Sequence, residues 1–225
     1  MKPIATCISY PKSGRTWLRY MLLQLIHEDD IKYHHDGFEF NDGALPAHNF
    51  DLDARLKKYS QGQKLVYLDR DPRDVMVSLF HQVTGRFSDF FNYGGTLSDF
   101  LRDDYFGALN LKKFREMWFT VLVNRPFLHI SYEQLHRNPV LVLDRVVKYL
   151  ELDVSLTNIV TAVSAGDIKK MKSLELSADF SEPWLRPRNG HTKVRKGEVG
   201  GFRSELCEQD IDYLNSIFAM TDKFD

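Results

Sequence analysis

Residues 4–27 constrain the fold of this chain more than any other stretch, because they read as a strand, a tight loop and a helix in direct succession. Residues 4–10 are short and largely apolar, and apolar side chains follow Arg15 at helical spacing. The loop between them, residues 11–16, contains Gly14, which lets a ligand approach the backbone closely. The unpaired amide groups at the start of the helix favour an anion there. The sequence therefore predicts an anion-binding loop.

This loop differs from the usual loop of ATP- and GTP-binding proteins, in which the lysine follows the second glycine. Here Lys12 precedes the only glycine, and the loop is shorter. One glycine between a strand and a helix fits a phosphate site and an ordinary turn equally well. The order Tyr-Pro-Lys-Ser-Gly-x-Thr-Trp is more specific, because at every position but Arg15 it resembles the loop of the sulfotransferases that use 3′-phosphoadenosine 5′-phosphosulfate (PAPS). The resemblance implies that Lys12, Ser13, Gly14, Thr16 and Trp17 of the loop bind this nucleotide. We count Arg15 among the nucleotide-binding residues as well: it stands where the family commonly has threonine and adds a positive charge, whose purpose the sequence leaves open.

A second strand, loop and helix occupy residues 64–83. The first residues form an apolar run, and Pro72 and Asp74 are residue types that start a helix. The segment Tyr-Leu-Asp-Arg-Asp-Pro-Arg-Asp-Val-Met-Val-Ser resembles the 3′-phosphate motif of the same sulfotransferases, which implies that Arg70 and Ser78 hold that phosphate. Arginine suits this role because its planar group can make two charge-assisted hydrogen bonds to phosphate oxygens.

Two later segments extend the resemblance. Residues 126–133 read as a buried strand that ends in Ser-Tyr-Glu, and the similar strand-end motif of the family implies that Tyr132 contacts the adenine nucleotide. The segment Arg-Lys-Gly-Glu-Val-Gly-Gly-Phe-Arg resembles the family's Arg-Lys-Gly-x-x-Gly-Asp-Trp-Lys signature. This likeness implies that Arg195, Lys196 and the amide of Gly197 close on the 3′-phosphate.

Basic residues gather in one part of the chain. Residues 186–203 contain six Lys or Arg residues and one Glu, whereas the formal net charge of the whole chain is −1. This distribution predicts a local anion site and argues against a general nucleic-acid or membrane binder. Asp167 and Ile168 stand where the family has a serine and a phenylalanine near the adenine, and whether aliphatic Ile168 replaces the aromatic contact stays open at this point.

The resemblance implies a reaction as well as a ligand. A sulfuryl group would move in line from PAPS to a hydroxyl or amine of a small-molecule acceptor, without a metal, and 3′-phosphoadenosine 5′-phosphate (PAP) would be released. Lys12 would stabilise the charge that grows on the bridging oxygen of the leaving phosphate. His48 lies 22 residues before Arg70, which is the family's spacing for its catalytic histidine. Neutral imidazole is abundant near pH 7, so the resemblance assigns the base to His48.

Two other classes of function stay open at this point. A P-loop nucleotide or small-molecule kinase would share the strand, the loop and an arginine-rich lid, but the displaced Lys12 counts against it. A catalytically inactive nucleotide-binding module would keep Arg70, Ser78 and Arg195 while lacking a base. His48 at the family's spacing argues against that second class.

Strands alternate with helices along the chain, and each strand ends in a polar loop. This order predicts an α/β fold with a mostly parallel central sheet, helices on both faces and the ligand at the carboxyl ends of the strands. A length of 225 residues with 43% hydrophobic content suits one domain, residues 1–225. We expect a cytoplasmic protein, because no apolar run is long enough to span a bilayer and no signal segment opens the chain. The two cysteines lack metal-ligand spacing, and the oligomeric state stays open.

The sequence says less about the acceptor than about the nucleotide. We expect residues 84–95 to form a mobile loop beside the acceptor, because Gly94-Gly95 interrupts an aromatic-rich stretch and Thr96 resembles a helix cap. Aromatic side chains on such a loop favour an acceptor with an apolar or ring-shaped body. Residues 32–60 read as loops with one short helix, and aspartates there, beside His48, suggest instead an amine or a polyhydroxylated acceptor. The aromatic residues are Phe87, Phe90, Phe91 and Tyr93, and the aspartates are Asp36, Asp42, Asp51 and Asp53.

Overall fold

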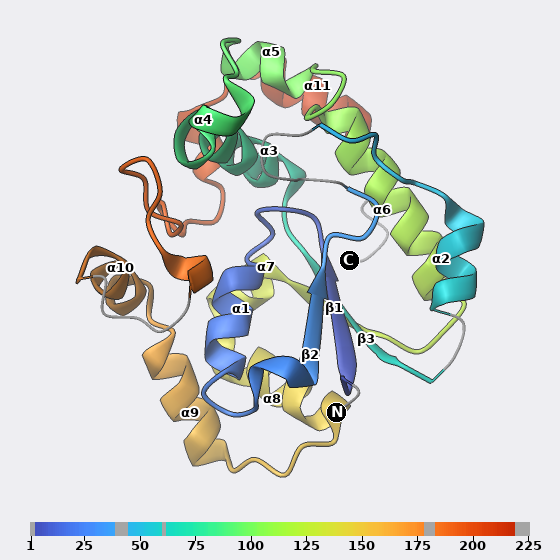
Figure 1. Ribbon diagram of the computed structural model, residues 1–225, viewed down its shortest axis with the longest axis vertical. Helices are drawn as coiled ribbons and strands as arrows, with labels where there is room; N and C mark the ends of the chain where they lie inside the picture. Colours follow the sequence, from blue (N-terminus) through green and yellow to red (C-terminus); the bar gives the residue numbers. More distant parts are fainter. Residues whose placement is uncertain (1–2, 39–44, 60–61, 178–182, 219–225) are drawn as a thin grey trace.

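Four parallel strands form one central sheet in a computed structural model of the chain, which describes residues 3–38, 45–59, 62–177 and 183–218 (Figure 1). The strands follow the order β2-β1-β3-β4, and every neighbouring pair is parallel. Their bounds are β1 (Ala5–Ser9), β2 (Ile31–His34), β3 (Lys64–Asp69) and β4 (Leu128–Ser131). The predicted α/β fold with a parallel sheet is therefore confirmed.

The sequence pattern did not predict β2, because residues 32–60 read as loops with one short helix. This strand has only four residues, Ile-Lys-Tyr-His, which are too few to show a clear alternation of apolar and polar side chains. The predicted short helix is α2 (Leu52–Lys58). Asp51 caps it by accepting a hydrogen bond from the amide of Ala54 at 3.0 Å.

Helices α3 and α5 begin where the sequence signals predicted. Pro72 opens α3, and Asp71 just before it accepts a hydrogen bond from the amide of Arg73. Thr96 caps α5 in a reciprocal arrangement with Asp99. The longer helices are α1 (Arg15–Leu22), α3 (Pro72–His81), α6 (Ala108–Val123), α8 (Pro139–Leu150), α9 (Leu156–Ala165), α10 (Ile168–Ser177) and α11 (Glu208–Phe218). The shorter ones are α4 (Ser88–Phe91), α5 (Leu97–Leu101) and α7 (Tyr132–Arg137), with 3₁₀ turns at Glu28–Asp30, Pro183–Leu185 and Gly201–Ser204 and a π-helical turn at Gln82–Arg86.

Apolar side chains pack on both faces of the sheet. Leu65 and Tyr67 of β3 belong to one buried cluster, whereas Val66 and Leu68 belong to the other, as the two-residue period of a strand requires. Side chains of α3 and α6 complete the first cluster, and those of α1, α8 and α9 complete the second, in agreement with their places in Figure 1. Helices therefore cover both faces, as predicted.

The aromatic-rich stretch between residues 87 and 118 contributes mainly to the core. α6 buries both Phe114 and Trp118 completely. The indole Nε1 of Trp118 donates a hydrogen bond to the backbone carbonyl of Asp36 at 2.9 Å. This hydrogen bond holds Asp36, in the segment that follows β2, against α6.

Candidate active site

The loop after β1 and the start of the segment after β3 meet residues 193–201 around a cavity of about 210 Å³. Every residue predicted to bind the nucleotide lines this cavity, with the exception of Ser13. Ser13 is buried, and its amide donates a hydrogen bond to the carbonyl of Tyr10 at 3.3 Å. The predicted residues on the cavity wall are Lys12, Gly14, Arg15, Thr16, Trp17, Arg70, Ser78, Tyr132, Arg195, Lys196 and Gly197. Folding thus assembles side chains from distant parts of the sequence.

The loop before α1 depends on glycine. Gly14 has φ 96, a left-handed conformation that few other residues adopt, and it directly precedes the first residue of α1. A Cβ atom there would lie 2.4 Å from Cδ2 of Tyr132, so no larger residue fits without displacing that ring. Trp17 packs edge-on against Tyr132 with ring centroids 5.7 Å apart, and its Nε1 donates to the carbonyl of Gly166 at 2.7 Å. The rings of Trp17 and Tyr132 and the loop at Gly14 therefore hold one another in position.

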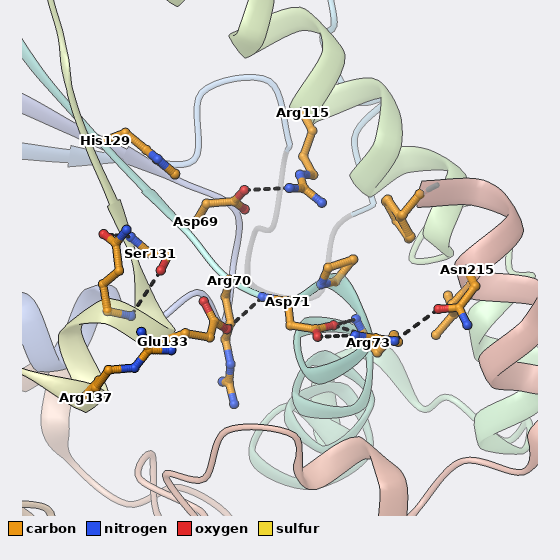
Figure 2. A pocket seen from close by; sticks show the side chains of 14 residues that line it. Asp69, Arg70, Asp71, Arg73, Arg115, His129, Ser131, Glu133, Arg137 and Asn215 are labelled. Atoms are coloured by element: carbon orange, nitrogen blue, oxygen red, sulfur yellow. Dashed lines mark hydrogen bonds and ion pairs between the residues drawn. The ribbon is translucent and has the colours of Figure 1, made fainter. Parts of the chain in front are cut away.

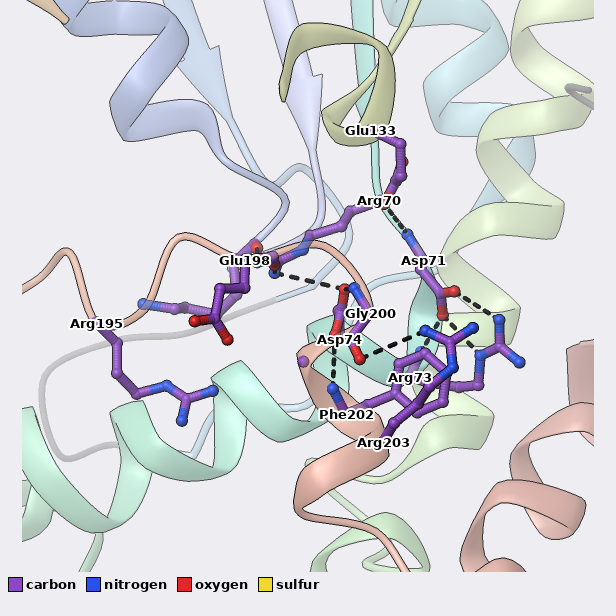
Figure 3. Close-up of polar contacts among 12 residues, drawn as sticks. Arg70, Asp71, Arg73, Asp74, Glu133, Arg195, Glu198, Gly200, Phe202 and Arg203 are labelled. Atoms are coloured by element: carbon purple, nitrogen blue, oxygen red, sulfur yellow. Dashed lines mark hydrogen bonds and ion pairs between the residues drawn. The ribbon is translucent and has the colours of Figure 1, made fainter. Parts of the chain in front are cut away.

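Arg70 connects the loop after β1 to the basic segment, residues 186–203, by hydrogen bonds. Its Nη1 donates to the carbonyl of Lys12 at 3.2 Å, and its Nη2 donates to the carbonyl of Glu198 at 2.9 Å. The guanidinium carbon also lies 4.2 Å from the ring centroid of Tyr132. Figure 3 shows Arg70 reaching from the end of β3 toward Glu198. Its side chain is therefore already fixed at the cavity wall.

Arg195 and Lys196 share one acidic partner that the sequence did not reveal. Glu205 Oε1 accepts hydrogen bonds from Arg195 at 2.6 Å and from Lys196 at 3.0 Å, and Oε2 lies 2.5 Å from Nε2 of His81. Although burial acts to raise it, these hydrogen bonds lower the pKa of Glu205 to about 2. The carboxylate therefore stays charged and holds both cations at the edge of the cavity.

Two lysines on the cavity wall are easily deprotonated. Burial, together with the positive charges of Arg86 and Arg70, lowers the pKa of Lys12 to about 7. Burial and the nearby charge of Lys12 lower the pKa of Lys193 to about 7 as well. Lys193 was not among the predicted site residues, although it lies in the basic segment 186–203, where Lys and Arg residues are concentrated. A bound anion would favour the charged form of both lysines.

His35 also lines the cavity and was not predicted, because its position depends on the unpredicted strand β2. A carbonyl can only accept, so Nδ1 of His35 donates to the carbonyl of Ser9 at 2.7 Å. Nε2 then accepts from Nη2 of Arg15 at 2.8 Å. Burial and the charge of Arg15 hold the pKa of His35 well below its usual range, so the ring is neutral. Arg15, whose purpose the sequence left open, is thereby anchored to the end of β2.

His48 lies apart from this group and does not line the cavity. Its ring stacks on Phe38 with centroids 4.1 Å apart and packs against Tyr105 at the same centroid distance. Nε2 lies 2.9 Å from the carbonyl of Tyr105. Because that carbonyl can only accept, Nε2 carries a proton. The structure therefore does not bring His48 onto the same cavity wall as Lys12.

The aromatic residues expected beside the acceptor have other contacts. Their segment contains the π-helical turn and α4, instead of an open loop. The guanidinium carbon of Arg188 lies 5.0 Å from the ring centroid of Phe87 and 3.6 Å from that of Phe90. Phe91 and Tyr93 pack partly against the core cluster that includes α6. None of these four aromatic residues lines the 210 Å³ cavity.

Most of the acidic alternatives have structural roles or positions outside the cavity. Asp36 accepts hydrogen bonds from Arg55 at 3.0 Å, Lys58 at 2.7 Å and the hydroxyl of Tyr59 at 2.5 Å. Asp51 caps α2. Asp36, Asp51 and Asp53 do not line the cavity, and Asp42 lies outside the described residues.

A larger cavity of about 610 Å³ borders the start of α3 (Figure 2). Its charged side chains largely bind one another, since Arg115 pairs with Asp69 at 2.7 Å and Arg73 pairs with Asp71 at 2.6 Å. Arg70 is the one predicted site residue on its wall. The smaller cavity gathers all the other predicted cations, so we place the candidate active site there.

Two features are absent from the described ranges, namely a metal-binding cluster and a membrane-spanning helix. Among residues 3–38, 45–59, 62–177 and 183–218, no three His, Cys, Asp or Glu side chains are grouped so that they could hold a metal ion. Across the same ranges, no helix is long and apolar enough to cross a membrane.

Comparisons with known proteins place these motifs in a family context. A family model of the sulfotransferase domain matches residues 5–224. Human sulfotransferase 2B1 is 24% identical over 88% of this chain and 60% of its own length, and Arabidopsis thaliana cytosolic sulfotransferase 12 is 22% identical over 89% of this chain and 72% of its own. This chain therefore spans less than two thirds of the human relative.

Solved structures with low sequence identity share the fold. Mouse sulfotransferase SULT7A1 complexed with PAP has a TM-score of 0.71 at 18% identity, and the match covers 100% of this chain and 85% of that one. Retinol dehydratase in a complex with retinol and PAP has a TM-score of 0.65 at 19% identity, and the match covers 100% of this chain and 82% of that one. The α/β architecture is thus that of these proteins.

Proposed function

This chain belongs to the sulfotransferase family, and we propose that it transfers a sulfuryl group from PAPS to a hydroxyl or amine of a small-molecule acceptor. One observation carries the proposal: a single cavity gathers the loop residue Lys12, the strand-end residues Arg70 and Tyr132, and Arg195 of the basic segment. Each belongs to a separate motif that resembles this family. The kinase and the inactive-module alternatives are not favoured.

The cavity wall suits a multiply charged nucleotide. Six Lys or Arg residues line it, whereas Asp74 and Glu198 are the acidic residues there. Arg70, Ser78 and the basic segment at 195–197 would hold the 3′-phosphate, as their motifs imply. Positive charge and amides at the start of α1 would hold the 5′ side. Trp17, Tyr132 and Ile168 also line the cavity and would enclose the purine.

PAPS supplies the sulfuryl group. Protonated Lys12 stabilises the charge that develops on the phosphate oxygen as the bond from that oxygen to sulfur breaks. His48 takes the proton of the acceptor as the acceptor oxygen or nitrogen bonds to sulfur.

His35 is the competing candidate for the base, because it lies on the cavity wall and His48 does not. Its Nδ1 donates to Ser9, however, and its lone pair on Nε2 accepts from Arg15. A base whose lone pair already accepts a hydrogen bond from a guanidinium is a poor proton acceptor. We therefore retain His48 and assign His35 to holding Arg15.

The names of the related proteins support a small organic acceptor. The retinol dehydratase complexes contain retinol and androsterone, and two guinea-pig relatives are named hydroxysteroid sulfotransferases. We propose an acceptor with an apolar or ring-shaped body for this chain. We also propose one domain over residues 1–225 and, from the names of the Arabidopsis relatives, a cytoplasmic location.

The test is a binding and turnover screen. PAP should raise the melting temperature of the protein, whereas ATP and adenosine 5′-phosphate should raise it little, because they lack the 3′-phosphate. PAPS should then sulfate some members of a panel of alcohols, phenols, sugars and amines. Equal thermal shifts with all three nucleotides would contradict the proposal and favour a kinase.

His48→Ala should abolish most turnover with any acceptor found, whereas His35→Ala should mainly weaken nucleotide binding. Near-normal turnover by the His48→Ala protein would show that another group is the base.

A further inference from the structure

The segment from Lys193 to Gly200 contains neither helix nor strand, yet buried carboxylates bind its backbone at both ends. At one end, Glu175 of α10 accepts hydrogen bonds from the amides of Lys193 and Val194, each at 3.1 Å. At the other end, Asp74 of α3 accepts from the amides of Gly200 at 2.7 Å and Phe202 at 3.0 Å. Glu175 is 1% exposed and Asp74 is 3% exposed. Carboxylates buried to this extent are costly unless they are hydrogen-bonded, and here the backbone amides are their partners.

Local conformation makes the contact with Asp74 possible. Gly200 has φ 75, in the left-handed region, so the chain turns sharply at this residue before the 3₁₀ turn begins. The turn directs the amides of residues 200 and 202 to the two oxygens of one carboxylate, as Figure 3 shows. Asp74 also lies 3.7 Å from Arg70, so the carboxylate contacts two parts of the proposed 3′-phosphate site.

The charges in this region explain why such anchors are needed. The segment carries Lys193, Arg195 and Lys196, and these three residues line the same cavity as Lys12 and Arg70. Like charges at this proximity repel one another, and the lowered pKa of Lys193 has the charge of Lys12 among its causes. In the absence of an anionic ligand, this repulsion favours movement of the segment away from the cavity. Two buried carboxylates oppose that movement.

We propose that Asp74 and Glu175 are positioning residues that hold residues 193–202 in the shape that binds the 3′-phosphate of the nucleotide. The inference rests on the proposed function. Neither carboxylate needs to touch the nucleotide, because each acts through backbone amides on either side of Arg195 and Lys196. Binding then requires little ordering of the segment, which favours affinity.

The experiment uses two isosteric substitutions, Asp74→Asn and Glu175→Gln. Each replaces a carboxylate oxygen by an amide nitrogen, so that one backbone N–H faces another donor. Titration calorimetry would measure the affinity of the full chain and of each variant for PAP and for adenosine 5′-phosphate. Each variant should bind PAP about tenfold more weakly or worse, with little change for adenosine 5′-phosphate. Asp212→Asn, at an exposed position on α11, is the matched control and should leave both affinities unchanged.

In turnover assays, both variants should raise KM for PAPS more than they lower kcat, a split that general destabilisation of the fold would not produce. Hydrogen exchange of the unmodified protein gives a measurement that does not depend on the folding of a variant. Peptides that cover residues 193–202 should be protected without nucleotide.

The outcomes separate the two proposals. If the unmodified protein fails to prefer PAP over adenosine 5′-phosphate, the proposed function is wrong. If it prefers PAP and a folded variant keeps that preference, the inference about the carboxylates is wrong. Exchange of residues 193–202 as fast as that of a freely solvated chain would also overturn it.

Discussion

Binding of PAP should weaken as the pH rises above 7, because Lys12 and Lys193 lose their protons there in the free protein. The pKa of each lysine is lowered to about 7, mainly by burial. A bound anion favours the protonated lysine, so the nucleotide must recruit the missing protons when the pH exceeds 7. Second ionisation of a phosphate occurs near pH 6, so the nucleotide itself changes little in charge above pH 7.

The magnitude follows from the fraction of protonated lysine. A lysine with a pKa of 7 is half protonated at pH 7 and about one-tenth protonated at pH 8, so each raises Kd about fivefold over this interval. The two lysines together should raise Kd about 30-fold, provided that both stay protonated in the complex. The folding stability of the free protein changes with pH in the opposite direction to its affinity for PAP. Unfolded lysines keep their protons up to a pKa of about 10.4, so the unfolded state binds more protons and folding stability increases as the pH rises from 7.

Titration calorimetry at pH 8 in buffers with different ionisation enthalpies measures both the Kd of PAP and the number of protons that are taken up on binding. We expect an uptake of about two protons on PAP binding and about one in Lys193→Met, which removes one of the titrating groups. The melting temperature of the free protein should rise over the same pH interval, and that rise should be smaller in the variant. A Kd that is unchanged between pH 7 and pH 8, or binding without proton uptake, would refute the reasoning.

Three further predictions concern single residues. Arg70→Ala should weaken PAP binding by about 2–5 kcal/mol, the usual cost of a lost charged contact, and an affinity that is unchanged in calorimetry would remove Arg70 from the site. Gly14→Ala should lower the free energy of unfolding in urea by about 1–3 kcal/mol, because a positive φ is strained for alanine and the new Cβ would lie 2.4 Å from Tyr132. Asp36→Ala should destabilise the fold by about 3–5 kcal/mol in the same assay, because it leaves the buried guanidinium of Arg55 without its carboxylate, whereas a loss below 1 kcal/mol would contradict that account.

Local signals in the sequence were sufficient for the parts of the site that follow strands. β1, β3 and β4 are apolar runs that end in polar motifs, and a parallel sheet places their carboxyl ends at one edge. Lys12, Arg70 and Tyr132 could therefore be predicted to meet before any contact was known. Helix starts such as Pro72 and the cap of Thr96 were also predictable, because each depends on a few neighbouring residues.

Other parts depend on contacts between residues that are distant in sequence. Asp74 was read as a helix-start residue, but nothing near it in sequence indicates that its carboxylate binds the amide of Gly200, 126 residues later. Glu205 and Glu175 likewise lie in segments without a distinctive pattern and act through tertiary contacts. His35 could not be predicted because β2 is too short to be recognised by its periodicity.

The donor side and the proposed base are therefore supported by different parts of the fold. Loops that leave β1 and β3, both in the middle of the sheet, supply proposed donor-binding residues, and the nearly inaccessible carboxylates of Asp74 and Glu175 bind the backbone of residues 193–202. His48 instead lies 14 residues after the last residue of β2 and is held by Phe38 and Tyr105 through ring contacts and a hydrogen bond to the carbonyl of Tyr105. Packing between rings tolerates substituted side chains of a different shape better than the hydrogen bonds of a buried carboxylate do. We therefore expect substitutions around Phe38 and Tyr105 to change the choice of acceptor at the proposed base His48 without disturbing the proposed nucleotide site.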